Sequence, residues 1–100
     1  MLCQVHSSVI FYHACPTEHT ESILKEGLLR SKSSLWKASG GAIYLTKEKI
    51  WMNKSKDHDI LIVSLPPKFR EENEMWKGAN GWEWIVWADI PPEYIYREES

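Results

Sequence analysis

Three residues that can do chemistry stand inside stretches of sequence that are typical of β-strands. They are His13, Tyr44 and Glu83, at positions where an apolar core residue would be the simpler choice. Such side chains can face solvent on alternate pleats, or they can be held in a cleft. In a cleft, a carboxylate stabilises developing positive charge and an aromatic ring fixes a flat ligand. The three positions therefore indicate a candidate ligand-binding cleft.

Glu83 gives the sharpest indication of the three. It lies between Trp82 and Trp84, and side chains alternate between the two faces of a strand. Alternation puts Glu83 on the face of Ile85 and Trp87, which is a poor place for a carboxylate that is merely solvated. On this pattern alone, a structural role and a carboxylate held in a cleft both stay open. The concentration of tryptophans here has two explanations that stay open, core filling and stacking against a ligand.

Cys15 offers a second chemistry, that of a thiolate nucleophile. It lies two residues after His13, so both side chains would point to the same side of one strand. No third group that would orient the histidine can be identified, so the cysteine is a minor alternative. The spacing of Cys3 and Cys15 matches neither a disulfide framework nor a zinc site. We expect two reduced thiols and no metal.

Length and composition predict one domain that covers residues 1–100. No apolar run is long enough to span a membrane, and the N-terminus lacks the pattern of a secretion signal. We expect a cytoplasmic protein without a membrane partner, and a monomer rather than an obligate oligomer. Residues 24–56 hold eight bases and two acids, whereas residues 57–100 hold four bases and ten acids. The basic middle suits a phosphate-bearing ligand, although lysines spread over the surface would give the same count.

The elements that must position these residues follow from periodicity and turn residues. Thr17 is expected to cap a helix that has acids in its first turn and ends at Gly27. The other expected elements are a strand over 8–13, a loop over 28–41, a strand over 42–46, a short helix over 47–54, a strand over 59–65, an irregular segment over 69–81 with a turn at 78–81, and strands over 82–88 and 94–96. This order predicts an α+β domain with a largely antiparallel sheet.

Three short motifs resemble those of the ADP-ribosyltransferase family, and of its poly(ADP-ribose) polymerase branch in particular. Residues 11–15 (FYHAC) look like the histidine motif, 41–46 (GAIYLT) like the tyrosine motif, and 82–88 (WEWIVWA) like the glutamate strand. The motifs stand in the family's order, and the resemblance covers nearly the whole chain. It implies a minimal ADP-ribosyltransferase fold with a split, mostly antiparallel sheet. In that fold His13, Tyr44 and Glu83 would meet in one cleft that binds NAD.

The resemblance also implies a role for each residue. His13 would hydrogen-bond a ribose hydroxyl of NAD, the backbone of Ala14 would hold the nicotinamide amide, and Tyr44 would stack against the nicotinamide ring. Glu83 would bind the 2′-hydroxyl of the nicotinamide ribose. There it would stabilise the oxocarbenium-like cation that forms as the glycosidic bond breaks. Within the basic loop, Arg30 is the first candidate contact for the pyrophosphate.

Lys32 is the second candidate contact for the pyrophosphate. The implied activity is that of an NAD-dependent mono-ADP-ribosyltransferase, which moves ADP-ribose to a protein, nucleic-acid or small-molecule acceptor and releases nicotinamide. Gly81 stands where members that modify arginine or asparagine carry Glu or Gln, which disfavours those targets. One alternative is a catalytically weak member that binds NAD, ADP-ribose or a partner protein. Another is an RNA 2′-phosphotransferase, which residues 90–95 (IPPEYI) resemble but whose branch lacks an acid at Glu83.

Overall fold

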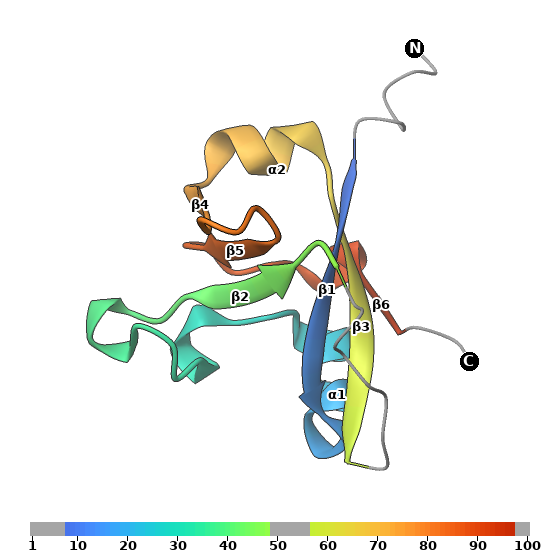
Figure 1. Cartoon of the computed structure of the whole chain (residues 1–100). Helices are drawn as coiled ribbons and strands as arrows, with labels where there is room; N and C mark the ends of the chain where they lie inside the picture. Colours follow the sequence, from blue (N-terminus) through green and yellow to red (C-terminus); the bar gives the residue numbers. More distant parts are fainter. Residues whose placement is uncertain (1–7, 49–56, 98–100) are drawn as a thin grey trace.

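The computed structural model describes residues 8–48 and 57–97 (Figure 1). The strands are β1 (Val9–Pro16), β2 (Ile43–Thr46), β3 (His58–Leu65), β4 (Met75–Lys77), β5 (Glu83–Val86) and β6 (Ile95–Arg97). The α-helices are α1 (Thr17–Glu26) and α2 (Pro67–Glu72), and short 3-10 turns are η2 (Arg30–Lys32), η3 (Lys37–Ser39) and η4 (Pro92–Tyr94). The described residues thus confirm the predicted α+β class with short helices.

The six strands form one sheet in the order β4-β5-β2-β1-β3-β6, and all neighbouring pairs are antiparallel. β1 continues to Pro16, beyond its predicted end at His13, because β3 pairs with it along its whole length. β1 and β2, by contrast, are joined at one residue pair, Tyr12 with Thr46. Figure 1 shows β2 and β5 running across the direction of β1 and β3. The sheet is continuous but nearly divided, and we call the gap between the end of β1 and the start of β2 the strand split.

The hydrophobic core lies on one face of this sheet. Its largest fully buried apolar side chains are those of Phe11, Leu45, Leu61, Val63, Leu65, Val86 and Ile90. They come from both halves of the sheet, so the core bridges the place where backbone pairing is thinnest. α1 contacts β1, β3 and β6, and Figure 1 shows it beside β1 and β3. α2 buries Phe69, which packs edge-to-face on Tyr94 with ring centroids 5.9 Å apart.

α1 begins directly after β1, with Pro16 at the N-cap position. The prediction that Thr17 caps the helix is wrong, because Thr17 is already the first helical residue and no side chain caps this end. Its backbone N–H donates instead to the carbonyl oxygen of Asp57 at 2.8 Å. Gly27 ends the helix as predicted, with a φ of 92°. Its N–H donates to the carbonyl oxygen of Ile23 at 2.7 Å, which closes the last turn.

Residues 69–81 are more ordered than predicted, since they include the second part of α2 and strand β4. Pro67 starts α2, where a fixed φ suits the first helical turn. β4 is an edge strand that pairs with β5. The sequence analysis did not predict these two elements, because the acidic residues around them interrupt the short apolar pattern that indicates a helix or a strand. The predicted turn at 78–81 is confirmed, and the N–H of Gly81 donates to the carbonyl oxygen of Gly78 at 3.0 Å.

Two further predictions concern the length and position of elements. The strand predicted over 82–88 is shorter, since β5 covers Glu83–Val86, and the segment 28–41 is a loop that contains η2 and η3. The helix predicted over 47–54 falls outside the described residues, apart from its first two positions. Across the described ranges 8–48 and 57–97, neither helix has the length and apolar character needed to cross a membrane.

Candidate functional site

A cleft of about 760 Å³ opens at the strand split, between the end of β1, α1, the loop 28–41 and the start of β2. Its volume is in the range that holds small-molecule ligands. The lining residues are His13, Ala14, Cys15 and Pro16 from β1, His19, Ser22 and Ile23 from α1, Gly27, Leu29, Ser31, Lys32, Ser33, Ser34, Leu35 and Lys37 from the connecting loop, and Ala42, Ile43 and Tyr44 around the start of β2. The connecting loop thus contributes serine hydroxyl groups and lysines to the lining, and β1 and β2 contribute the strand residues.

His13 spans the strand split with its side chain. Its Nδ1 lies 2.9 Å from the carbonyl oxygen of Tyr44. A carbonyl oxygen can only accept, so Nδ1 carries the proton and donates, which leaves Nε2 as an acceptor in the neutral ring. Burial lowers the pKa of His13 from its ordinary value, and this effect outweighs the opposing effect of the hydrogen bond to Tyr44. The imidazole is therefore neutral at physiological pH and can accept a hydrogen bond from a ligand hydroxyl.

Tyr44 and Glu83 form a short side-chain hydrogen bond across β2 and β5. The phenol of Tyr44 donates to Oε2 of Glu83 at 2.6 Å. Burial raises the pKa of Tyr44 to about 12, and the hydrogen bond to Glu83 and its negative charge act in the same direction. Tyr44 faces Ile85 in the ladder, so Glu83 is its diagonal neighbour, within reach of a long side chain. The pair keeps the phenol protonated and fixes the direction of the carboxylate.

Asn80 is a positioning residue for this carboxylate that the sequence analysis missed. Its Nδ2 donates to Oε1 of Glu83 at 2.9 Å. Its Oδ1 accepts from the backbone N–H groups of Trp82 and Glu83, both at 3.1 Å. These bonds fix which end of the amide faces Glu83. An asparagine in a turn directly before a strand is a common signal for such a local bond.

The three residues of the resemblance lie on three adjacent strands, and Tyr44 contacts both others. Its carbonyl oxygen accepts from His13 and its hydroxyl donates to Glu83. His13, Ala14 and Tyr44 line the cleft, whereas Glu83 is not among the lining residues. The pairing of Tyr12 with Thr46 also places Tyr12, rather than His13, on the sheet face of Tyr44 and Glu83. The His13 ring therefore contacts the Tyr44 backbone at the strand split, whereas the Tyr44 ring and Glu83 lie on the other face of the sheet. The three side chains do not line one cleft as expected, because the register of β1 with β2 turns His13 to the opposite face.

Arg30, the first candidate for the pyrophosphate, holds its own loop together and does not line the cleft. Its Nε donates to the carbonyl oxygen of Gly41 at 2.7 Å, and its Nη2 donates to that of Ser39 at 3.1 Å. The guanidinium also lies over the ring of Trp87, 5.7 Å from the centroid. Its donors are directed at the loop, so the expectation that Arg30 leads in phosphate binding loses its geometric basis.

Lys32 and Lys37 are the cations of the loop that do line the cleft. Lys32 forms an exposed ion pair with Glu26, with 3.0 Å between Nζ and Oε1. Lys37 forms no ion pair with any residue that the structure describes, so its charge is available to a ligand. The sequence analysis counted Lys37 only within the basic middle, because a count of charges cannot tell which of them face a cavity. His19 of α1 also lines the cleft and was not predicted.

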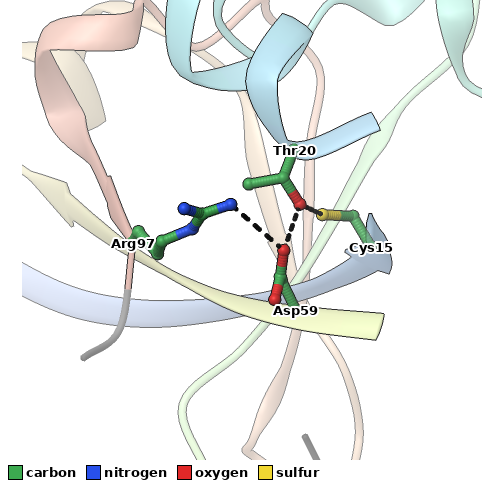
Figure 2. A network of polar contacts seen from close by, with 4 residues as sticks. All are labelled: Cys15, Thr20, Asp59 and Arg97. Atoms are coloured by element: carbon green, nitrogen blue, oxygen red, sulfur yellow. Dashed lines mark hydrogen bonds and ion pairs between the residues drawn. The ribbon is translucent and has the colours of Figure 1, made fainter. Parts of the chain in front are cut away.

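Cys15 belongs to a buried polar network rather than to a nucleophilic pair (Figure 2). The hydroxyl of Thr20 donates to Oδ2 of Asp59 at 2.6 Å, so the Cys15 thiol, 3.5 Å away, donates to Thr20 Oγ1. Nη2 of Arg97 lies 3.5 Å from the same oxygen of Asp59. Burial is the main factor that raises the pKa of the Cys15 thiol. A protonated thiol that donates to a neighbour is a poor nucleophile, which weakens the cysteine alternative. Figure 2 shows that the network joins β1, α1, β3 and β6.

The tryptophans divide between the two explanations left open by the sequence. Trp84 packs against the core, edge-to-face with Phe11 at a centroid distance of 5.8 Å. Trp76 and Trp87 instead form a cluster with Trp36, outside the core. Core filling therefore accounts for Trp84, and the cluster needs a separate account.

Within residues 8–48 and 57–97, no group of three or more His, Cys, Asp or Glu side chains is placed to hold a metal ion. Comparison of the chain with protein-family models, curated proteins and solved structures finds no match. The function is therefore argued from the cleft and the three linked residues.

The Tyr44 phenol is expected to ionise at about pH 12 in the folded protein. Because this pKa is raised above the unfolded value of about 10, the interaction stabilises the fold fully below about pH 10 and is lost as the pH rises through about 12. Ultraviolet absorbance of phenolate in an alkaline titration measures this, and Tyr44→Phe identifies the late step. Glu83→Gln is expected to lower the pKa of Tyr44. A late step that persists in Tyr44→Phe would contradict the assignment.

Proposed function

We propose that this chain is a minimal, NAD-dependent mono-ADP-ribosyltransferase that transfers ADP-ribose to a protein, nucleic-acid or small-molecule acceptor and releases nicotinamide. The observation that carries the proposal is the double contact of Tyr44 at the cleft, with His13 through its backbone and with Glu83 through its hydroxyl. These are the three residues on which the resemblance to the family rests. Their adjacency on β1, β2 and β5 supports a minimal version of that fold.

The walls of the cleft suit the two halves of NAD. Nε2 of His13 is free to accept from a ribose hydroxyl, because Nδ1 is bound to the Tyr44 carbonyl. Ala14 lines the cleft next to it, in reach of an amide group on the ligand. Lys32 and Lys37 line the same cleft, and their charges suit the pyrophosphate.

Glu83 has the charge that the chemistry needs. As the bond between nicotinamide nitrogen and ribose C1′ breaks, its electron pair leaves with nicotinamide, and positive charge spreads over C1′ and the ring oxygen. A carboxylate held beside the ribose stabilises the charge that develops there more than it stabilises the bound ground state, in which the positive charge lies on the nicotinamide ring. Tyr44 and Asn80 each occupy one lone pair of the two carboxylate oxygens, so further acceptor capacity remains for a ribose hydroxyl. The acceptor nucleophile then forms its bond to C1′ and releases its proton to the solvent.

One observation favours the second candidate function, a member that binds NAD or ADP-ribose without turnover. Glu83 is not among the residues that line the cleft, and both of its carboxylate oxygens already accept hydrogen bonds. If the carboxylate stays in this position when ligand is bound, it supports Tyr44 rather than the reacting ribose. Binding and turnover must therefore be measured separately.

Thermal unfolding in the presence of NAD or ADP-ribose tests binding. Ligand at a hundred times its dissociation constant stabilises the fold by about 2.7 kcal/mol, which raises the Tm of a domain of this size by roughly 10 °C or more. Lys37→Ala is expected to reduce the shift because it removes a cation from the cleft wall. Lys68→Ala is the matched control, since Lys68 is exposed on α2 and does not line the cleft.

Turnover is tested by incubating the protein with labelled NAD and a cell lysate, and then identifying the labelled class of molecule. An unchanged Tm with both millimolar NAD and millimolar ADP-ribose would contradict the proposed cleft. A clear shift without label in any acceptor would instead support the binding protein.

A further inference from the structure

Three tryptophans form a cluster outside the core, and we call Trp36, Trp76 and Trp87 the tryptophan cluster. The ring centroids of Trp76 and Trp87 are 5.0 Å apart, those of Trp36 and Trp87 are 6.0 Å apart, and those of Trp36 and Trp76 are 6.4 Å apart. The rings meet at steep angles, so each ring touches the edge or the tilted side of another. Arg30 lies over Trp87 and so supports the cluster from the loop.

Two of these rings are exposed to an extent that core packing does not explain. Trp36 is 53% exposed and Trp76 is 47% exposed. Trp36 also has a φ of 53°, in the left-handed region, where it is the one non-glycine residue among those that the structure describes. A bulky residue in that region is strained, and such strain concentrates where a side chain must be presented in a set direction. The loop therefore holds Trp36 outward at a conformational cost.

The tryptophan cluster lies on the same face of the sheet as the Tyr44–Glu83 pair. Trp76 of β4 faces Ile85 of β5 in the ladder, and Ile85 faces Tyr44 of β2 on its other side. Directly paired residues project from the same face, so these three side chains form a row across three strands. Glu83 shares that face through alternation along β5.

The loop that carries Trp36 is basic and can supply cations for a polyanion. The loop 28–41 contains Arg30, Lys32 and Lys37 and no acid. Lys37 follows Trp36 directly and forms no ion pair with a described residue. Three acids lie near the cluster or on its face of the sheet, and each has a hydrogen bond within the fold. Glu74 accepts from Nε1 of Trp76 at 2.6 Å, Asp89 accepts from the backbone N–H of Arg30 at 2.7 Å, and Glu83 accepts from Tyr44 and Asn80.

We propose that the tryptophan cluster binds single-stranded nucleic acid, with bases stacked on Trp36 and Trp76 and phosphates beside Lys37. Exposed aromatic rings next to cations are the combination that binds single strands without reading a sequence, because every base presents a π-face. A duplex keeps its bases stacked on each other and cannot use the rings in this way. The proposal does not depend on NAD.

Fluorescence anisotropy of a labelled oligodeoxythymidine of about ten nucleotides, in low salt and without NAD, tests the proposal. The wild-type protein is expected to bind at micromolar concentration. Trp36→Ala and Trp76→Ala are each expected to weaken binding about 5-fold to 150-fold, which corresponds to the loss of one stacked base. Tyr96→Ala is the matched control, because Tyr96 is an exposed aromatic residue on β6, at the opposite edge of the sheet. It is expected to leave the affinity unchanged.

An abasic oligomer of the same length and charge separates stacking from charge in the wild-type protein alone, which covers the case in which Trp76→Ala unfolds. It is expected to bind much more weakly than the oligodeoxythymidine. Equal binding of the abasic oligomer or of a duplex would overturn the proposal, as would an unchanged affinity in a folded Trp36→Ala protein. The absence of binding would overturn it too, whatever NAD does at the cleft.

Discussion

Glu83→Gln is expected to lower ADP-ribose transfer by about 10²–10³-fold while NAD still raises the Tm of the protein. The carboxylate acts when positive charge develops on the ribose, so its charge affects the transition state more than the bound ground state. The side-chain oxygen of glutamine can still accept from Tyr44, but its NH2 group cannot accept from Asn80 Nδ2. The Asn80 amide cannot rotate to accept a hydrogen bond from this NH2 group, because its Oδ1 already accepts from two backbone N–H groups. The rate is measured as labelled product per unit time at saturating NAD.

Glu93→Gln is the matched control for this experiment. Glu93 lies in η4, is exposed, and does not line the cleft. It is expected to transfer ADP-ribose at the wild-type rate. Equal rates for wild type and Glu83→Gln would show that the enzymatic proposal is wrong. If NAD stabilises both proteins and neither labels an acceptor, the protein that binds without turnover is the better account.

Phe11→Ala is expected to lower the free energy of unfolding by about 3–5 kcal/mol, a large part of the about 5–15 kcal/mol that a domain of this kind has. The Phe11 ring is 1% exposed and packs edge-to-face on Trp84, which belongs to the other half of the sheet. Its removal leaves a cavity at the place where backbone pairing between the halves is thinnest. Urea unfolding with a free fit of midpoint and slope measures the loss.

Ile10→Ala is the matched control on the same strand, since Ile10 is 43% exposed and faces away from the core. Ile10→Ala is expected to change the free energy of unfolding by about 0.5 kcal/mol, as is usual for a surface substitution. If the two variants lose the same free energy, Phe11 does not hold the two halves together.

The elements that were predicted well are those whose signal is local. The apolar run before Pro66 and the turn at Gly78 and Gly81 can be recognised from residue types alone, because prolines and glycines mark chain reversals. The candidate residues His13 and Tyr44 also stood out locally, as polar groups within strands. Their contact through a backbone carbonyl could not be predicted, because it depends on where the pairing of β1 and β2 stops.

The parts that were missed depend on distant partners. Arg30 and Lys37 look alike as charges in a basic loop, yet one is bound to loop carbonyls and the other lines the cleft. The face on which Glu83 lies relative to His13 follows from two registers, that of β1 with β2 and that of β2 with β5, and register is set by tertiary packing. Trp76 lies in a short edge strand among acids, and only its pairing with β5 makes it a strand residue.

The near division of the sheet has a consequence for how the chain assembles. Most strand partners are far apart along the sequence, as Val9 with Leu65 and Ile43 with Val86 are, whereas β4 and β5 are joined by a short turn. Closing long loops costs entropy before the contacts that they allow can form. Among the named strands, β4 and β5 are therefore the pair that can form early. The pairing of β1 with β2 gains little stabilisation, because only one residue pair joins these strands. The two halves meet late, through side chains, and the cleft exists only once they have met.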